Sequence, residues 1–303
     1  MTFDAKSLLQ AAANVAAGQQ YPKGALYLVA TPIGNLADIT LRAVQVLQLA
    51  DLVACEDTRV TGQFLRHLGL DKKLVALHQH NEVGGAQQLL GQLQAGARIA
   101  YVSDAGTPAV SDPGAHLVSV AQSAGIQVIP LPGASSVTTA VSAAGDTLAQ
   151  GFRFLGFLPA KGVARQTALR EALIPGCSLV LFEAPHRIEA LARDLIEVLP
   201  QGRVTLCREL TKQFEEIDTI DISLMPAWLQ ANPHRQRGEF VLVVHAQPAR
   251  DDAATLTPAQ AELLKALSTH LPVKQAAGLV ADVTGLPRKA LYEQALQWRQ
   301  EQP

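Results

Sequence analysis

The sequence is poor in charged residues, aromatic residues and cysteine. Of its 303 residues only 17% are charged and 5% are aromatic, whereas 48% are hydrophobic. Globular proteins carry about 25% charged residues, so this composition argues against a disordered chain or a solvated helical rod. The 25 Lys and Arg residues nearly balance the 27 Asp and Glu residues, and the formal net charge is -2. This balance argues against a general binder of polyanions.

The cysteines and the hydrophobic runs exclude further classes of protein. Cys55, Cys177 and Cys207 are odd in number, far apart and without a CxxC pair. They indicate neither a disulfide framework nor a zinc site, and they fit a reducing cytosol. No apolar run approaches the roughly 18 residues that span a bilayer, and the Ala-rich first 20 residues lack the core of a signal peptide. We therefore expect a cytoplasmic protein.

From residue 25, short apolar runs alternate with segments of helical spacing. This alternation is typical of parallel strands joined by crossover helices. We expect a mostly parallel sheet with helices on both faces, and ligands beyond the carboxyl ends of its strands. The predicted strands are 25–31, 51–55, 74–77, 97–102 and 127–131, with helices near 40–49, 60–68, 85–95, 113–124 and 135–144.

A second series of strands follows the small and turn-forming residues from Ala144 to Gly151. Its strands are more widely spaced and more polar, which is typical of a mixed sheet. We place a domain boundary near residue 147, so the fold class is α/β with two α/β domains. The predicted strands are 153–157, 177–182, 203–208, 215–222 and 239–245, with helices near 161–172 and 186–198.

The C-terminal tail has the outline of a helix-turn-helix. Within residues 273–296, Gly285 ends one helix and Pro287 suits the first turn of the next. Arg288 and Lys289 begin that second helix, as in helices that bind nucleic acid; a three-helix packing domain is the alternative. The predicted organisation is a variable extension at 1–23, domains at 24–146 and 147–247, a linker, and a helical domain at 255–303.

Three loops at predicted strand ends are rich in small residues. SDAGTPAVSDPG, residues 103–114, combines Gly, Pro and Asp, so its backbone follows an irregular path that exposes N–H groups. A turn that only caps the next helix is the alternative. In VATPIGNLADIT, residues 29–40, Gly34 lets a ligand approach, but the GxGxxG spacing of dinucleotide sites is missing. With LPGASS, residues 131–136, these loops predict one cavity for a nucleoside-sized ligand.

Ionisable residues follow the neighbouring strands of the first domain. The strand at 51–55 leads into Glu56, Asp57 and Arg59, and the strand at 74–77 leads into HQHNE, which ends at Glu82. These groups can orient a substrate, or they can form a salt-bridged first turn of a helix. The two histidines of HQHNE lack a third spaced ligand, so we expect no metal.

In the second domain, Glu209 and Lys212 follow the strand at 203–208. They are three residues apart, which is one turn if the segment is helical. Either group can assist removal of a proton from a substrate hydroxyl; an ion pair on a surface turn is the alternative. The chain has no GxSxG elbow and no Walker A sequence, so acyl transfer through a serine triad and NTP hydrolysis lack support.

Together these strings resemble one family. ATPIGNLADIT, EDTR, HNE, SDAGTPAVSDPG, PGASS, GFLP, FEAPHR and RELTK are similar to motifs of the RsmI family of bacterial small-subunit ribosomal RNA 2'-O-methyltransferases, in the tetrapyrrole-methylase-like superfamily. The similarity runs from about Gly24 to His245, and the tail resembles the family's C-terminal helical domain. It implies a class III S-adenosylmethionine-dependent enzyme, with the cofactor between two α/β domains, that forms a homodimer.

The resemblance also implies a reaction and its residues. A methyl group would pass to the ribose 2'-oxygen of a cytidine in 16S rRNA, near the decoding centre of the small ribosomal subunit. The oxygen must be aligned with the methyl group and stabilised as its proton leaves. The implied cofactor-binding residues are Ile33, Gly34, Ser103, Asp104, Thr107, Ser135, Ser136 and Glu183. The catalytic candidates, with no base assigned, are Glu56, Asp57, Arg59, Glu82, Glu209 and Lys212.

Two alternatives stay open: methylation of a tetrapyrrole or another small metabolite, and RNA binding without catalysis. The chain departs from the family pattern at Gln213 and Phe214, where a more polar stretch is expected. The net charge of -2 is an average, because residues 59–73 and 153–193 each hold three more basic than acidic residues. Local basic patches of this kind are compatible with one site on a folded RNA.

Overall fold

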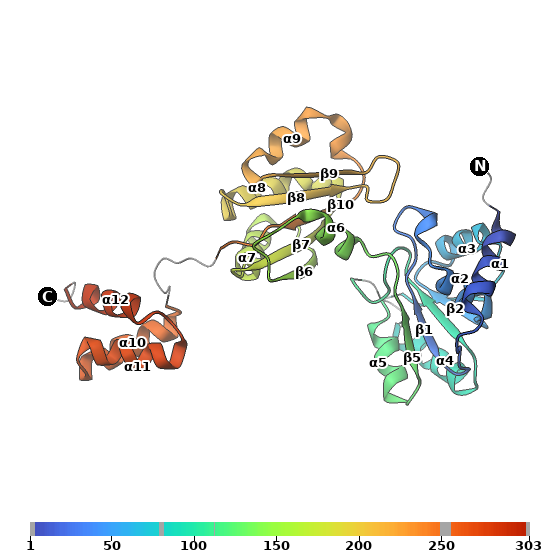
Figure 1. Ribbon diagram of the computed structural model, residues 1–303, viewed down its shortest axis with the longest axis horizontal. Coiled ribbons are helices and arrows are strands. Elements are labelled where there is room, and N and C mark those ends of the chain that lie inside the picture. The colour runs from blue at the N-terminus through green and yellow to red at the C-terminus, as the bar shows by residue number, and fades with distance from the viewer. Residues whose placement is uncertain (1–3, 79–81, 112, 249–255, 301–303) are drawn as a thin grey trace. The chain divides into compact units, whose positions relative to one another are not determined.

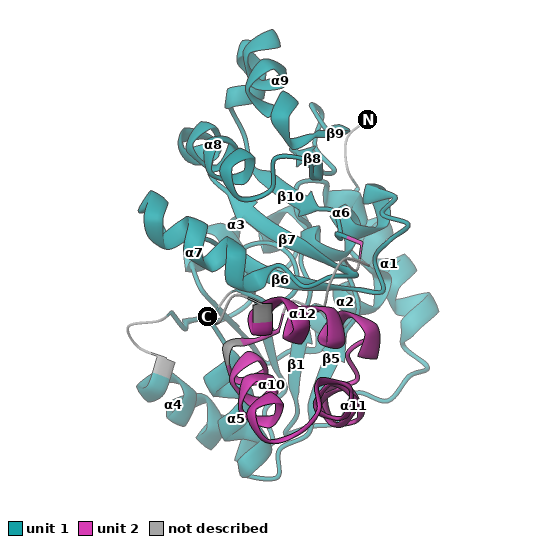
Figure 2. Ribbon diagram, turned by 90° about the vertical axis from the view of Figure 1, so that its left-hand side faces the viewer, with its two compact units in different colours: residues 1–247 teal, residues 248–303 magenta. Residues whose placement is uncertain are grey.

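The computed structural model describes residues 4–78, 82–111, 113–248 and 256–300. The chain divides into two compact units, Met1–Gln247 and Pro248–Pro303 (Figure 2). The larger unit holds two five-stranded sheets, and the smaller unit is helical (Figure 1). None of the helices in the described ranges is long and apolar enough to cross a membrane.

The first sheet is parallel throughout, which confirms the expectation from the βα alternation. Its strand order is β3-β2-β4-β1-β5. Each strand is only three or four residues long, and β2 and β4 are buried along their whole length. The strands are β1 (Leu26–Val29), β2 (Leu52–Cys55), β3 (Leu74–Ala76), β4 (Ile99–Val102) and β5 (Val128–Leu131).

Helices cover both faces of this sheet. One core joins α1, α2 and α3 to residues such as Val29 and Val53, and the other joins α4 and α5 to residues such as Leu26 and Tyr101. Thr40 caps α2, because its side chain accepts a hydrogen bond from the Ala43 N–H at 3.1 Å. The helices are α1 (Ala5–Ala16), α2 (Leu41–Leu49), α3 (Thr58–His67), α4 (Glu82–Gln94) and α5 (Ala115–Ser123).

The strand order places a topological switch point between β1 and β4. From β1 the chain passes through α2 to β2, on the far side of β4; from β4 it passes through α5 to β5, on the far side of β1. Ligands of such sheets bind beyond the carboxyl ends of the strands at this point. The loops that begin at Ala30 and Ser103 leave the sheet there.

The second sheet is mixed, as predicted, with the order β6-β7-β10-β8-β9. β6 and β7 are parallel, and the other pairs are antiparallel. One face packs on α7, α8 and α9, and the other on α6. The elements are α6 (Ser136–Ala144), β6 (Gly151–Phe157), α7 (Gly162–Ala172), β7 (Cys177–Glu183), α8 (Ile188–Val198), β8 (Arg203–Arg208), β9 (Glu216–Asp221), α9 (Met225–Ala231) and β10 (Phe240–Val244).

Several basic residues of the two stretches at 59–73 and 153–193 serve the fold itself. Arg165 is 4% exposed and forms an ion pair with Asp194. The Lys72 ammonium donates to the carbonyl oxygens of Gln48 and Ala50 at 2.6 and 2.9 Å, and so satisfies the end of α2. The two stretches therefore offer fewer free charges to RNA than their sequences indicate.

The smaller unit is a three-helix domain. Leu264, Ala276, Val280 and Leu291 are fully buried at its centre. Gly285, at φ +71°, ends the second helix in the left-handed conformation that favours glycine. The helices are α10 (Pro258–His270), α11 (Val273–Thr284) and α12 (Arg288–Gln300), which confirms the two helices predicted around the Gly285 turn.

Candidate active site

The loops after β1 and β4 are joined at the switch point. Thr31 donates its N–H to the Gly106 carbonyl oxygen at 2.9 Å, and Gly106 donates to the Thr31 carbonyl oxygen at 3.0 Å. The Thr31 hydroxyl also donates to the Ser103 carbonyl oxygen at 3.2 Å. Gly106 has φ +81°, and a Cβ there would lie 3.4 Å from the Ile33 side chain. The loop after β1 (residues 29–40, the first loop) and the loop after β4 (residues 103–114, the third loop) thus form one surface.

The loops after β2 and β5 join the same surface. The Asp57 N–H donates to the Asp104 carboxylate at 3.2 Å, which links the loop after β2 to the loop after β4. The Thr107 hydroxyl donates to the Ala134 carbonyl oxygen at 3.1 Å, immediately before Ser135. The structure therefore brings together most of the residues implied for cofactor binding, namely Ile33, Gly34, Ser103, Asp104, Thr107, Ser135 and Ser136.

The three serines of this group differ in what they leave free. Ser103 is 2% exposed, and its hydroxyl bonds to the carbonyl oxygens of Ala105 and Gly106 at 3.3 and 3.2 Å, so it braces the loop. Ser135 and Ser136 are half-buried at the start of α6, and within the described ranges their hydroxyls have no hydrogen-bond partner. The first N–H groups of a helix also lack partners within the helix. The start of α6 can therefore bind polar groups of a ligand.

The second sheet reaches this surface through the turn after β8. Gly34 has φ +155°, and a Cβ on it would overlap Lys212 Cγ and lie 3.1 Å from Thr211 Oγ1. Only glycine lets Lys212 lie over the first loop in this way. Ile33 packs beside it against the apolar cluster of α6 and the second sheet, which includes Val137. The site therefore takes residues from both sheets of the larger unit.

Lys212 is held by two carboxylates. Its ammonium donates to Glu209 at 2.9 Å and to Glu239 at 2.7 Å, and Glu209 also accepts the Glu239 N–H at 2.9 Å. The segment is not helical, because Glu209 and Thr211 have φ of +52° and +66°. Glu209 and Lys212 therefore form an ion pair on a turn, which was the alternative to a helical segment.

Burial opposes charge on both members of this pair, but their partners prevail. Burial alone would raise the pKa of Glu209, yet the Glu239 N–H and Lys212 lower it. Burial would likewise lower the pKa of Lys212, yet Glu239 and Glu209 raise it. Lys212 is therefore a fixed cation beside the first loop, not a base.

The acidic residues after β2 have two different environments. Asp57 caps α3 by accepting the Arg59 N–H at 2.8 Å, and it pairs with the Arg59 guanidinium at 2.6 Å. Hydrogen bonds from Arg59 lower the pKa of Asp57 to about 2. The alternative of a salt-bridged first helical turn thus describes these two residues. Burial raises the pKa of Glu56, and the charge of Asp104 raises it further.

Asp104 is perturbed in the same direction as Glu56. Burial raises its pKa, and the Asp57 charge adds to the shift, although the Asp57 N–H opposes it. Within the described ranges the Glu56 carboxylate has no hydrogen-bond partner. A carboxylate with a raised pKa is better matched to proton transfer near neutral pH than an ordinary one. Glu56 and Asp104 therefore share a raised pKa on this surface.

Two candidates lie apart from this surface or beyond description. The side chain of Glu183 is fully buried, where it accepts the Ala184 N–H at 2.9 Å and pairs with Arg187 at 3.0 Å. No contact of the described residues links it to the strand-end loops, so its role in cofactor binding stays a prediction. The side chain of Glu82 lies outside the described residues, as do His80 and Asn81. The described residues hold no cluster of three metal-ligating side chains.

Comparison with known proteins agrees with this arrangement. Residues 25–223 match the family of tetrapyrrole (corrin/porphyrin) methylases, and residues 254–299 match the RsmI C-terminal HTH domain. The ribosomal RNA small subunit methyltransferase I of Escherichia coli O157:H7 is 46% identical over 277 residues, which cover 91% of this chain and 96% of that protein. This chain belongs to the ribosomal RNA small subunit methyltransferase I family.

Other members of the ribosomal RNA small subunit methyltransferase I family are similarly close. The Vibrio cholerae protein is 46% identical over 280 residues, with 91% of this chain and 96% of that protein covered. The family resemblance inferred from the motifs is therefore confirmed, as is the helix-turn-helix outline of the tail.

Solved structures of more distant proteins share the fold. The uroporphyrin-III-C-methyltransferase of Thermus thermophilus has a TM-score of 0.53 at 23% identity, and covers 74% of this chain and 94% of its own. Diphthine synthase has a TM-score of 0.55 at 17% identity, with 73% and 89% covered. These likenesses confirm the α/β fold class predicted for this chain.

Sequence reasoning missed Glu239, the second carboxylate on Lys212. It is separated from Lys212 by 27 residues, and the pairing of β10 with β8 brings the two together. A lone glutamate before a predicted strand carries no signal of that contact, which depends on the strand order of the second sheet.

Proposed function

We propose that this chain transfers the methyl group of S-adenosylmethionine to the ribose 2'-oxygen of a cytidine in 16S rRNA, near the decoding centre. The observation that carries the proposal is 46% identity over 91% of the chain to proteins named ribosomal RNA small subunit methyltransferase I. The four loops joined at the switch point supply a place for the cofactor. A methyltransferase acting on a tetrapyrrole and an RNA-binding protein without activity are the competing functions.

The residues at the switch point fit S-adenosylmethionine. Its sulfonium group is cationic, and Asp104 places a carboxylate on the loop surface. The hydroxyls of Ser135 and Ser136, which have no partner among the described residues, can bind polar groups, and Ile33 offers an apolar contact. When bound, the cofactor supplies an electrophilic methyl group. We assign Gly34, Ser103 and Thr107 to the shape of the same surface, through the contacts they make within it.

The catalytic roles follow from the charges of the candidates. A ribose hydroxyl is a very weak acid, so its oxygen needs a base or a nearby cation as the proton leaves. Glu56 accepts the proton, because its pKa is raised and it lacks a hydrogen-bond partner among the described residues. Lys212, fixed by Glu209, stabilises the developing charge on the oxygen. Arg59, whose side chain is 89% exposed, contacts an RNA phosphate while Asp57 orients it.

The function is tested on RNA from a strain that lacks the gene. We expect mass spectrometry of its 16S rRNA to show the loss of one 2'-O-methylcytidine, and the purified protein to restore it on isolated small subunits. Tetrapyrroles and other free metabolites serve as competing substrates in the same assay. An unchanged nucleoside profile would overturn the proposal, and absence of S-adenosylmethionine binding in calorimetry would favour RNA binding alone.

The base is tested separately by Glu56→Gln. We expect kcat to fall about 100-fold or more, with the acidic limb of the kcat profile lost and the affinity for S-adenosylmethionine kept within about twofold. Glu171→Gln, which changes an exposed carboxylate on α7, is the matched control. An unaltered pH profile in Glu56→Gln would exclude Glu56 as the base.

We also propose that the protein acts as a homodimer in the cytoplasm, as the family resemblance implies. Sedimentation velocity of the full chain checks the first point, since a monomer across the working concentration range would contradict it. Cell fractionation checks the second.

A further inference from the structure

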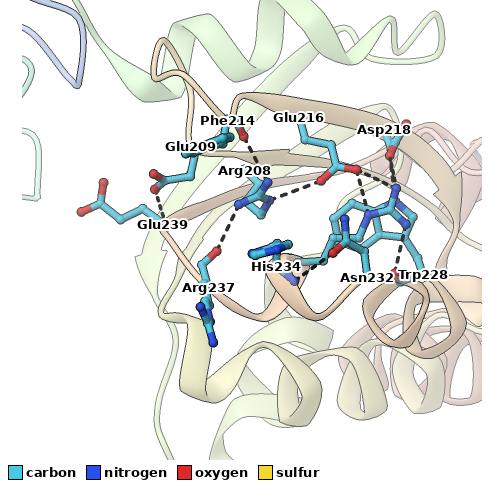
Figure 3. A network of polar contacts seen from close by, with 11 residues as sticks. Arg208, Glu209, Phe214, Glu216, Asp218, Trp228, Asn232, His234, Arg237 and Glu239 are labelled. Atoms are coloured by element: carbon cyan, nitrogen blue, oxygen red, sulfur yellow. Dashed lines mark hydrogen bonds and ion pairs between the residues drawn. The ribbon is translucent and has the colours of Figure 1, made fainter.

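A cavity of about 400 Å³ lies beside the turn that carries Lys212. Its walls are the end of β8, the turn that follows, and the loop before β10 (Figure 3). The lining side chains include Arg208, Glu209, Phe214, Asn232, His234 and Arg237. Phe214 is the position at which the sequence departs from the polar stretch expected after Lys212.

Arg208 holds the walls of this cavity together. Its side chain is 9% exposed, and its guanidinium donates to the carbonyl oxygens of Phe214 and Arg237 at 3.1 and 3.5 Å. It also pairs with Glu216 at 3.3 Å (Figure 3). Arg235 pairs with the other oxygen of Glu216 at 2.6 Å. The cavity is thus preformed, so a ligand need not order it on binding.

Three side chains that line the cavity are exposed. Phe214 is 67% exposed. Arg237 is exposed, and its guanidinium has no hydrogen-bond or ion-pair partner among the residues that the structure describes. His234 is also exposed. Phe214 and Arg237 lie on opposite sides of Arg208 (Figure 3). An exposed ring can stack on an unstacked base, and an exposed guanidinium can bind a phosphate of the same strand.

The cavity is adjacent to the proposed catalytic surface. Glu209 lines the cavity and also holds Lys212, which lies over Gly34. Gly238 closes the cavity tightly on Glu209, since a Cβ there would lie 2.6 Å from the glutamate side chain. One polynucleotide strand can therefore present its target ribose at Lys212 and a neighbouring base in the cavity.

We propose that this cavity binds a nucleotide of 16S rRNA close in sequence to the methylated cytidine, with Phe214 stacking on its base and Arg237 binding a phosphate of the same strand. The inference rests on the proposed function. The proposed occupant is RNA, because the exposed Arg237 guanidinium of the cavity is cationic and its exposed apolar side chain, Phe214, is a flat ring.

The test measures steady-state methylation of small ribosomal subunits purified from the deletion strain. Phe214→Ala should raise KM for the subunits about 5- to 150-fold, the range for loss of one stacked base, with kcat and the affinity for S-adenosylmethionine unchanged. Phe214→Trp should keep the parent KM. Phe214 is exposed, so the unfolding midpoints of both variants should match the parent.

Salt distinguishes the role of Arg237 from that of Phe214. Each phosphate contact contributes a slope of about 0.7 to 0.9 in log affinity against log salt. Arg237→Ala should raise KM and reduce this slope by about that amount, whereas Phe214→Ala should leave the slope unchanged. Phe152→Ala and Lys6→Ala, which remove an exposed ring on β6 and an exposed cation on α1, are matched controls and should change neither quantity.

Photocrosslinking identifies the occupant. Phe214→p-benzoylphenylalanine should crosslink to 16S rRNA within a few nucleotides of the methylated cytidine; a crosslink only to a ribosomal protein would overturn the inference. Parent-like KM values for both Phe214→Ala and Arg237→Ala would also overturn it, while methylation by the parent protein leaves the proposed function standing. A parent that methylates no rRNA instead overturns the proposed function.

Discussion

Gly34 and Lys212 should be energetically coupled, because the glycine leaves the space in which the lysine lies. In Gly34→Ala the new methyl group overlaps Lys212 Cγ. The backbone at φ +155° costs a residue with a Cβ about 1–3 kcal/mol, and the overlap costs about 1–3 kcal/mol more. We therefore expect Gly34→Ala to lower the free energy of unfolding by roughly 2–6 kcal/mol.

In the Lys212→Ala background the overlapping atom is gone, while the backbone strain remains. Gly34→Ala should then cost the strain of about 1–3 kcal/mol. The contact of the new methyl group with Thr211 Oγ1 at 3.1 Å is present in both backgrounds and cancels in the cycle. The loss of the Lys212 ion pairs is common to both Lys212→Ala variants, so it cancels in the double-mutant cycle. The expected coupling is about 1–3 kcal/mol.

Urea unfolding of the four full-length proteins measures this coupling, and calorimetric titration with S-adenosylmethionine shows whether the first loop stays in place. Gly96→Ala is the control, because Gly96 has φ +92° and nothing within 4 Å of its Cβ position. Its cost should be the same with and without Lys212→Ala. Costs for Gly34→Ala that add to those for Lys212→Ala within about 0.5 kcal/mol would refute the reasoning.

Three further predictions concern carboxylates. Asp104→Ala should weaken S-adenosylmethionine binding in calorimetry with thermal unfolding nearly unchanged, and equal affinity would refute its assignment. Arg165→Ala leaves Asp194 buried without its guanidinium and should cost about 3–5 kcal/mol in urea unfolding; a cost under about 1 kcal/mol would contradict this. Burial alone would raise the pKa of Asp146, but backbone N–H groups and the Ser178 hydroxyl outweigh burial, and the pKa lies below its ordinary value. Its stabilisation is therefore present above the unfolded pKa of about 4 and lost as pH falls, so Asp146→Asn should flatten the acid decline in unfolding free energy.

The strands were predictable because each is a short apolar run that ends at turn-forming residues. The helix α1 was not, since its buried positions are the small residues Ala12 and Ala16, which stand out little in an Ala-rich segment. The helix α9 spans only Met225–Ala231, too short for a helical period to show. Element type was therefore readable where apolar periodicity was strong, and unreadable where burial depended on small or few side chains.

The ligand loops were predictable because glycine and proline mark irregular backbone at strand ends. Their joining was not, because the bridge between Thr31 and Gly106 depends on β1 and β4 being neighbours. The spacing of Glu209 and Lys212 suggested a helical turn, but the segment has left-handed residues that no glycine announces. Arg165 counted as free positive charge in the sequence, whereas its ion pair with Asp194 depends on the packing of α7 on α8.

The position of β10 has a consequence for synthesis of the chain. β10 is the last strand in sequence, yet it lies between β7 and β8 and pairs with both. Until the ribosome has released residues 240–244, β7 and β8 lack their shared neighbour and expose two edges of unpaired backbone N–H and C=O groups. The first sheet needs only residues 26–131 for its strands, so we expect vectorial folding, with the first sheet formed while the second waits for its central strand.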